Sequence, residues 1–341
     1  MIGEVFDGGV EAVCSFQSNT KALDGVLNYA MWYSIVATFT NASWDMQELE
    51  YQYTNIVDEC QDSTLLGTFS ANHDVARIAN VTKDIAQQSN ALAWTLMGDG
   101  IPVIYYGEEA AELGLAGGID PDNREALWLT GYNTTTTLYS IIRACNEARN
   151  ALASLATYDY WTPYWTWKTK IIASYEDFIA VRKSYDRSIV TIVTNRGSDA
   201  KAIGPHTFGN TNFNYGDTIV DLIGCTTQKV GRYGNITVTI PAGGKPMVSF
   251  YLLLLVFLML HERLIVSVKV WIPAKWVWNT TLCPSLNLKQ WKGFKSAVAV
   301  VEGNIDLSET YGTTVTSSSS VLRNSVLWTG VVALGAMILG L

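Results

Sequence analysis

The sequence predicts an α/β fold followed by a small antiparallel β-sandwich, and three observations support this prediction. Short apolar strands alternate with amphipathic helices over residues 1–155, a pattern typical of a parallel sheet with helices outside it. Short β-branched runs separated by turns fill residues 156–249, as in a sandwich of antiparallel strands. The length of 341 residues accommodates about two domains.

The first region contains helices with clear periodicity and strands that are short and apolar. Apolar residues recur at steps of three and four from Met46 to Ile56, which predicts a helix over Asp45–Glu59. Thr82 is the predicted N-cap and Gly98 the stop of a helix over Thr82–Met97. The other predicted elements are strands at Ile2–Phe6, Gly25–Tyr29, Thr64–Phe69 and Ile101–Tyr106, and helices running through Phe39 and over Leu138–Leu152.

The second region reads as a set of short strands. An aromatic run from Tyr158 to Trp167 precedes them; we interpret it as core packing at the junction of the two domains, with a sugar-stacking platform as the alternative. Turns at residues 195–198 and 242–244 separate strands from one another. The predicted strands are Ile171–Ala173, Phe178–Arg182, Ile189–Thr194, Thr218–Leu222 and Ile236–Ile240.

Composition excludes several classes of protein. Apolar residues make up 48% and charged residues 16% of the chain, which suits a large core and argues against disorder. The net charge of −8 argues against a nucleic-acid partner. The three histidines lie far apart and the five cysteines form no Cys-x-x-Cys pair, so we expect no structural zinc site.

After Met247 the sequence matches neither pattern. We interpret residues 250–311 as an insert. The segment from Val248 to about Trp278, which overlaps the start of this insert, reads as a translated intron or frame error, with a membrane-associating hairpin as the alternative. The eleven apolar residues of Phe250–Leu260 are too few to span a bilayer. Residues 312–341 combine small residues, a polar spacer and the apolar run Val326–Leu341, the layout of a GPI-attachment signal. A terminal membrane helix is the alternative.

Five Asn-x-Ser/Thr sequons favour a secretory route. The N-terminus carries no signal-peptide pattern, and because GPI attachment requires entry to that route, we expect an N-terminal segment to be missing. The sequons begin at Asn41, Asn80, Asn133, Asn235 and Asn279.

Three polar motifs follow three predicted strands, where the side chains of a barrel enzyme face the reaction chamber. They are Gly3-Glu4-Val5, then Asn72-His73-Asp74, and then the loop from Asp120 to Arg124. Each has a structural alternative: a surface acid, a turn whose Asp caps the next helix, and an ion pair within a loop. Their succession along the strands favours a site for sugar hydroxyls and developing positive charge.

These motifs resemble those of the fungal α-amylases of glycoside hydrolase family 13, and the resemblance runs through most of the first 250 positions. It implies a partial (β/α)₈ TIM barrel, strands 5–8, over residues 1–155, followed by the sandwich. The matching segments are Ile2-Gly3-Glu4-Val5 with Asp7-Gly8, Asp24–Tyr29, Asp62–Phe69, Asn72-His73-Asp74, Asp99–Pro102 with Ile104-Tyr105, Asp120-Pro121 with Asn123–Ala126, and Val220 with Ile223–Thr227.

The resemblance also implies roles. Glu4 corresponds to the general acid/base and Asp74 to the third acid, which stabilises the distorted sugar. The family's sugar-binding positions correspond to His73, Asp120, Arg124 and, on the leaving-group side, Asp7. A disulfide is implied between Cys14 and Cys60, and Cys225 corresponds to half of a second one, for which Cys283 could substitute as partner. Cys145 reads as a buried free thiol.

The family's nucleophile and calcium ligands lie upstream of the Gly-Glu-Val strand, so we expect this chain to lack both and to bind no metal. We therefore expect a fragment of an enzyme that hydrolyses α-1,4-glucans with retention, unstable and inactive alone. The expected partner is an α-glucan and the expected location is the cell surface or wall, through a GPI anchor. The alternatives are a cell-wall α-glucan transferase, a non-catalytic glucan-binding surface protein, and a pseudogene product.

Overall fold

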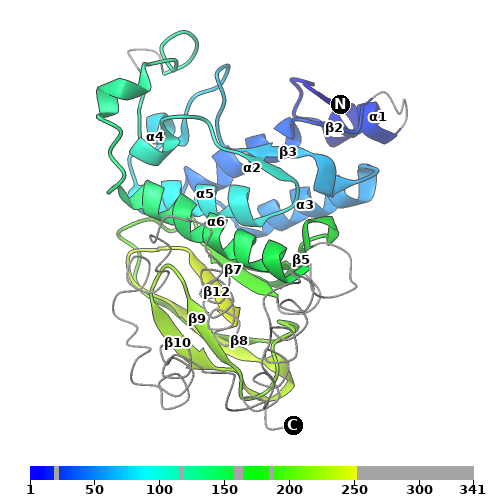
Figure 1. Ribbon diagram of the computed structural model, residues 1–341, viewed down its shortest axis with the longest axis vertical. Coiled ribbons are helices and arrows are strands. Elements are labelled where there is room, and N and C mark those ends of the chain that lie inside the picture. Colours follow the sequence, from blue (N-terminus) through cyan, green and yellow to red (C-terminus); the bar gives the residue numbers. More distant parts are fainter. Residues whose placement is uncertain (19–22, 115–117, 157–163, 184–187, 252–341) are drawn as a thin grey trace, which may run out of the picture. The chain divides into compact units, whose positions relative to one another are not determined.

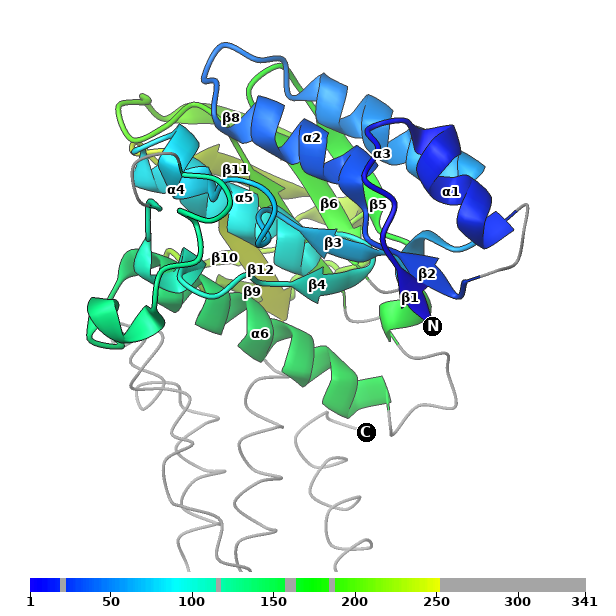
Figure 2. The same ribbon diagram turned by 90° about the horizontal axis from the view of Figure 1, so that it is seen from above.

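The computed structural model describes residues 1–18, 23–114, 118–156, 164–183 and 188–251. Its first region contains parallel strands in chain order (Figure 2). Strand β1 pairs with β2, Leu27 bridges from the end of β2 to Gly67, and β3 pairs with β4. The predicted parallel sheet is thereby confirmed. The strands are β1 (Ile2–Gly3), β2 (Gly25–Val26), β3 (Gly67–Phe69) and β4 (Ile101–Val103).

Helices connect these strands and lie outside them (Figures 1 and 2). The sequence predicted α2, α3, α5 and α6, but it missed α1 and α4, which are too short to show a clear period. None of the helices within the described ranges is both long and apolar enough to cross a bilayer. The helices are α1 (Val10–Ser18), α2 (Tyr29–Phe39), α3 (Gln47–Glu59), α4 (Ile78–Val81), α5 (Ile85–Met97) and α6 (Thr137–Ala156).

Helix α5 corrects one prediction. Its N-cap is Asp84 and not Thr82, because the Asp84 carboxylate accepts hydrogen bonds from the backbone N–H groups of Ala86 and Gln87. The same carboxylate accepts the N–H and hydroxyl of Ser198 in the second region. Gly98 ends the helix as predicted. Every residue from Ala86 to Met97 is buried, since α5 contacts β3 and β4 of the parallel sheet as well as β7 of the antiparallel sheet.

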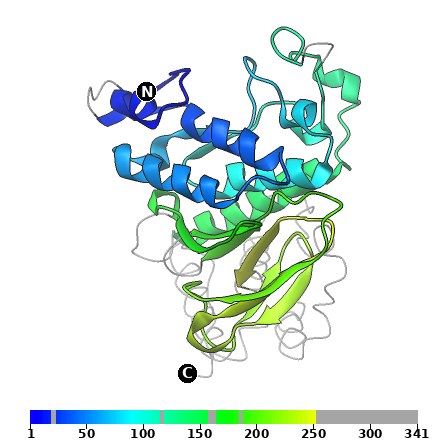
Figure 3. The same ribbon diagram turned by 180° about the vertical axis from the view of Figure 1, so that it is seen from behind.

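The second region is antiparallel, as predicted (Figures 1 and 3). Six strands form one sheet in the order β10-β9-β12-β7-β6-β5, and β8 pairs with β11. Apolar side chains of both sheets share one core, which confirms the sandwich. The strands are β5 (Lys170–Ser174), β6 (Ile179–Lys183), β7 (Ile189–Val193), β8 (Ile203–Phe208), β9 (Thr218–Asp221), β10 (Thr226–Lys229), β11 (Ile236–Ile240) and β12 (Met247–Tyr251).

Strand β12 changes where the sandwich ends. The sequence placed the loss of pattern at Val248 and the insert at residue 250, but β12 continues to Tyr251 and lies between β7 and β9. Phe250 is paired with Val220 there. An unbroken apolar run is what a central strand shows when both its faces are covered, so its start was mistaken for foreign sequence. The predictions for residues 252–341 fall outside the described residues.

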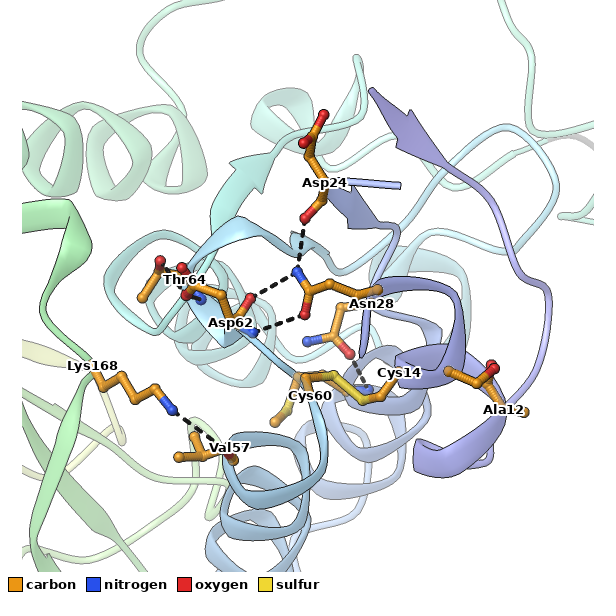
Figure 4. The surroundings of a disulfide bond; sticks show 12 residues. Ala12, Cys14, Asp24, Asn28, Val57, Cys60, Asp62, Thr64 and Lys168 are labelled. Carbon is orange, nitrogen blue, oxygen red and sulfur yellow. Dashed lines mark hydrogen bonds between the residues drawn. A yellow bond between two sulfur atoms is a disulfide. The ribbon is translucent and has the colours of Figure 1, made fainter. Parts of the chain in front are cut away.

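A disulfide joins Cys14 of α1 to Cys60 at the end of α3, as the resemblance implied (Figure 4). Their Cα atoms are 4.7 Å apart, within the usual range for a disulfide. Cys225 is also disulfide-bonded. Its candidate partner, Cys283, lies outside the described residues. Cys145 is buried and free, as predicted. The Cys14–Cys60 bond fixes the first helix, which follows β1, onto the third.

Buried polar groups around Asp99 connect the two regions. Asp99 lies between α5 and β4, and its carboxylate contacts the Lys183 ammonium of β6 at 2.6 Å. It also accepts hydrogen bonds from the Thr169 N–H and hydroxyl, and from the hydroxyls of Tyr53 and Ser63. Burial alone would raise the pKa of Asp99, but the Lys183 charge and these donors outweigh burial and hold the pKa below its ordinary value.

We predict that Lys183→Met destabilises the protein by about 3–5 kcal/mol, because it leaves a buried carboxylate without its counter-charge. Stability supplied by a carboxylate with a lowered pKa is present at neutral pH and is lost as the pH falls through that pKa. In the variant the Asp99 carboxyl has lost the Lys183 charge and can take up a proton as the pH falls, so the destabilisation relative to the native chain should be smaller at pH 4 than at pH 7. Urea unfolding of the full chain at pH 7 and pH 4 measures both effects. Lys201→Met, at an exposed lysine of the same region, is the control, and equal effects of the two substitutions would contradict the prediction.

Candidate active site

Glu4 lies directly after β1, at the carboxyl end of the parallel sheet, and is exposed. One of its carboxylate oxygens, Oε1, accepts a hydrogen bond of 2.8 Å from the hydroxyl of Tyr29. Tyr29 is the first residue of α2, shortly after β2, and is fully buried. Glu4 is therefore more than a surface acid, because a neighbouring strand supplies a buried donor to it.

The Asn72-His73-Asp74 motif follows β3 at the same edge of the sheet. Asn72 Oδ1 accepts the N–H groups of Asp74 (2.8 Å) and Val75 (3.1 Å), which closes a tight turn. Asn72 Nδ2 donates to the Tyr29 hydroxyl at 2.7 Å. Asp74 does not cap the next helix, because α4 starts at Ile78 without a side-chain cap. The motif thus joins the Glu4 side of the site.

Arg124 brings the second and third motifs together. Its Nε lies 2.7 Å from Asp120 Oδ1 and its Nη2 lies 3.2 Å from Asp74 Oδ1. Nε also donates to the His73 carbonyl at 3.3 Å, and His73 Nε2 lies 3.4 Å from Asp74 Oδ2. Asp74, Asp120, His73 and Arg124 therefore form one cluster, and the predicted Asp120–Arg124 ion pair is part of it.

Buried Asn123 supports this cluster from below. Its Nδ2 donates to the carbonyl oxygens of Asn72 (3.2 Å), His73 (3.1 Å) and Val75 (2.9 Å). The backbone turn that carries Asp74 is thus held by the residue next to Arg124. Sequence reasoning gave Asn123 no role; its position inside the third motif was the one signal available.

The Tyr29 phenol connects the electrostatics of the two acids. Burial is the largest cause and raises its pKa; the hydrogen bond from Asn72 opposes this shift, and the nearby Glu4 and Asp74 carboxylates raise the pKa further. Tyr29 therefore stays protonated and remains a donor at any working pH. Sequence reasoning missed Tyr29, which reads as one more apolar residue at the start of α2. Asp7 lies in the segment after Glu4, where its carboxylate accepts the Gly9 N–H at 2.7 Å.

The chemistry available here suits a neutral polar ligand. The side chains of His73, Asp74, Asp120 and Arg124 keep 55%, 37%, 52% and 43% of their surface exposed, so they can reach a ligand. Carboxylates and ring nitrogens are good partners for hydroxyl groups. Within the described ranges, no group of three or more His, Cys, Asp and Glu side chains is placed to hold a metal ion.

Glu108, unlike the exposed acids of the site, is buried. Its Oε1 accepts the Ser70 hydroxyl at 2.6 Å and its Oε2 accepts the Tyr105 N–H at 2.9 Å. It thereby joins the segment after β3 to the segment after β4. Burial raises the pKa of Glu108 to about 7, although the bonds from Ser70 and Tyr105 oppose the shift.

Comparisons with known proteins agree with this geometry. The model of the α-amylase catalytic domain matches residues 1–196, and that of α-amylase domain C matches residues 171–253. The chain is 37% identical over 248 residues to α-amylase 1 of Schwanniomyces occidentalis, covering 72% of this chain and 46% of that protein. It is 37% identical over 247 residues to the α-amylase of Saccharomycopsis fibuligera, again covering 72% and 46%.

Among solved structures, an α-amylase from Malbranchea cinnamomea matches with a TM-score of 0.67 and 35% identity, covering 74% of this chain and 51% of that one. This chain therefore spans about half the length of the curated relatives that it matches. The matched parts include both the parallel sheet with its three motifs and the antiparallel sandwich.

We predict that Glu108→Gln makes stability less dependent on pH. A glutamate whose pKa is raised on folding binds more protons in the folded state than in the unfolded state. Its contribution therefore lowers the free energy of unfolding as the pH rises from about 4.5 to about 7. Glutamine mimics the protonated acid. Relative to the native chain, the free energy of unfolding of Glu108→Gln should therefore be higher at pH 7.5 than at pH 4.5, by roughly 2–4 kcal/mol. Urea unfolding of the full chain at the two pH values measures this. Exposed Glu11→Gln is the control; a parallel pH dependence of Glu108→Gln and native would refute the prediction.

Proposed function

This chain belongs to the α-amylase family, and from that premise we propose that it provides the acid/base side of a site that hydrolyses α-1,4-glucans with retention. Glu4 protonates the glycosidic oxygen and later activates water. Asp74 stabilises the positive charge that develops on the sugar. His73, Asp120 and Arg124 hold the sugar's hydroxyl groups, and Asp7 lies toward the leaving-group side.

One observation carries this proposal: the acids and the arginine converge on one edge of the parallel sheet. Glu4 and Asp74 follow β1 and β3, and they are joined through Tyr29 and Asn72. Arg124 is joined to Asp74. Carboxyl ends of barrel strands are where barrel enzymes place their catalytic groups, and a fixed acid beside a charge-stabilising carboxylate is what glycoside cleavage requires.

Retention requires a second carboxylate that attacks the anomeric carbon, about 5 Å from the acid/base. In the part of the chain that the structure describes, Glu4 is hydrogen-bonded to a phenol, and Asp74 is ion-paired with Arg124. Because this proposal gives Glu4 and Asp74 other roles, we assign the nucleophile to a residue other than these two. A closed barrel also needs strands beside β1 and β4, and these would bring the nucleophile to the same edge.

The test uses a fusion protein. In it, the part of the Schwanniomyces occidentalis α-amylase 1 that this chain does not match is placed ahead of Met1 of the full chain. We expect this fusion to hydrolyse maltoheptaose and to release products that are first in the α-anomeric form, as proton NMR would show. Glu4→Gln in the fusion should lower kcat/KM by about 10²- to 10⁴-fold, because general acid catalysis is lost.

Exposed Glu11→Gln in α1 is the matched control and should leave kcat/KM unchanged. Hydrolysis by the fusion that Glu4→Gln does not slow, or products that are first β-anomeric, would contradict the proposal. Binding of maltoheptaose without turnover would favour a glucan-binding protein instead. Products longer than the substrate would favour glucan transfer.

We further propose that the protein acts at the cell surface, held by a GPI anchor added in residues 312–341. The support is the sequence alone: small residues, a spacer and a terminal apolar run. Release of the protein from cells by a phosphatidylinositol-specific phospholipase is the expected result, and retention after that treatment would contradict it.

A further inference from the structure

A continuous chain of hydrogen bonds connects the Glu4 carboxylate with the backbone N–H of Asp74. Asn72 Nδ2 donates to the Tyr29 hydroxyl at 2.7 Å, and that hydroxyl donates to Glu4 Oε1 at 2.8 Å. At the other end, Asn72 Oδ1 accepts the Asp74 N–H at 2.8 Å. Each atom of this chain therefore has a fixed donor or acceptor role.

The direction of the chain is set by the chemistry of its middle member. A phenol has one proton to donate, and here it goes to Glu4, because the amide of Asn72 can only donate from Nδ2. The pKa of Tyr29 is raised by burial and by the two carboxylates, so the phenol does not ionise and reverse the bond. Its ring is fixed by edge-on contact with Phe69 and Trp32.

Resting on the function proposed above, we propose that Tyr29 and Asn72 are positioning residues for the general acid: Tyr29 holds Oε1 of Glu4 so that Oε2 carries the catalytic proton toward the glycosidic oxygen, and Asn72 sets Tyr29 and Asp74 together. The Tyr29–Glu4 bond occupies one carboxyl oxygen. The other oxygen then remains for the substrate.

The bond changes follow from this arrangement. As the bond between the anomeric carbon and the glycosidic oxygen breaks, its electron pair stays on that oxygen, which takes the proton from Glu4 Oε2. The anomeric carbon is bonded by the nucleophilic carboxylate. Water then attacks that carbon, giving its proton back to Glu4 and releasing the carboxylate. Tyr29 keeps its own proton throughout.

The test exploits the leaving group. Cleavage of an aryl maltoside with an acidic phenol needs little help from a general acid, whereas cleavage of maltoheptaose needs it fully. In the fusion described above, Tyr29→Phe should lower kcat/KM by ~10- to 100-fold for maltoheptaose and much less for the 2-chloro-4-nitrophenyl maltoside. Tyr33→Phe, at an exposed tyrosine of the same helix, is the matched control and should change neither value.

A second measurement needs no activity. In the full chain labelled with [δ-¹³C]glutamate, Tyr29→Phe should move the Glu4 resonance at pH 8, because the carboxylate loses a donor. Glu4→Gln assigns that resonance, and Tyr33→Phe should leave it in place. An unmoved resonance, or equal losses on the two substrates, would overturn the inference. A moved resonance with an inactive unsubstituted fusion would support the contact and count against the proposed function alone.

Discussion

The buried carboxylate of Asp99 is the interaction on which the rest of the described structure depends. It lies where α5 turns into β4, and it receives donors from four other segments: Tyr53 of α3, Ser63 before β3, Thr169 before β5, and Lys183 of β6. A buried carboxylate without partners would cost several kcal/mol. Because its partners come from both regions, Asp99 fixes the parallel sheet and the antiparallel sandwich to each other.

This arrangement separates rigidity from chemistry. Asp99 precedes β4 and Ser63 precedes β3, so the buried network lies at the amino ends of these strands. The exposed acids follow β1 and β3 at the carboxyl ends. Barrel enzymes divide stability and catalysis between these same two ends. The hydrogen bonds of Glu108 with Ser70 and of Asn123 with the turn after β3 fix the segments that carry the site at the carboxyl ends.

Sequence reasoning succeeded where the information is local and failed where it depends on distant partners. The motifs containing Glu4, Asp74 and Arg124 follow strands that the alternating pattern predicts, so their common edge could be expected. Tyr29 donates to a residue 25 positions away and Lys183 pairs with one 84 positions away, and neither has a local signature. The prediction missed the start of β12 for a different reason. A strand buried on both faces shows no alternation of apolar and polar residues from which it could be recognised.

The charges of the site also restrict what it can hold. Among the described residues of the cluster, Arg124 is the one permanent cation. The Nε and Nη2 atoms of Arg124 are already directed at Asp120 and Asp74. An anionic group such as a phosphate could accept only from the remaining Arg124 donors and would there face the negative charges of both carboxylates. A neutral sugar meets no such repulsion, because its hydroxyls can donate to Asp74 and Asp120 while accepting from the remaining Arg124 donors. The electrostatics therefore favour an uncharged polyhydroxyl ligand over a phosphorylated one, independently of the family to which the chain belongs.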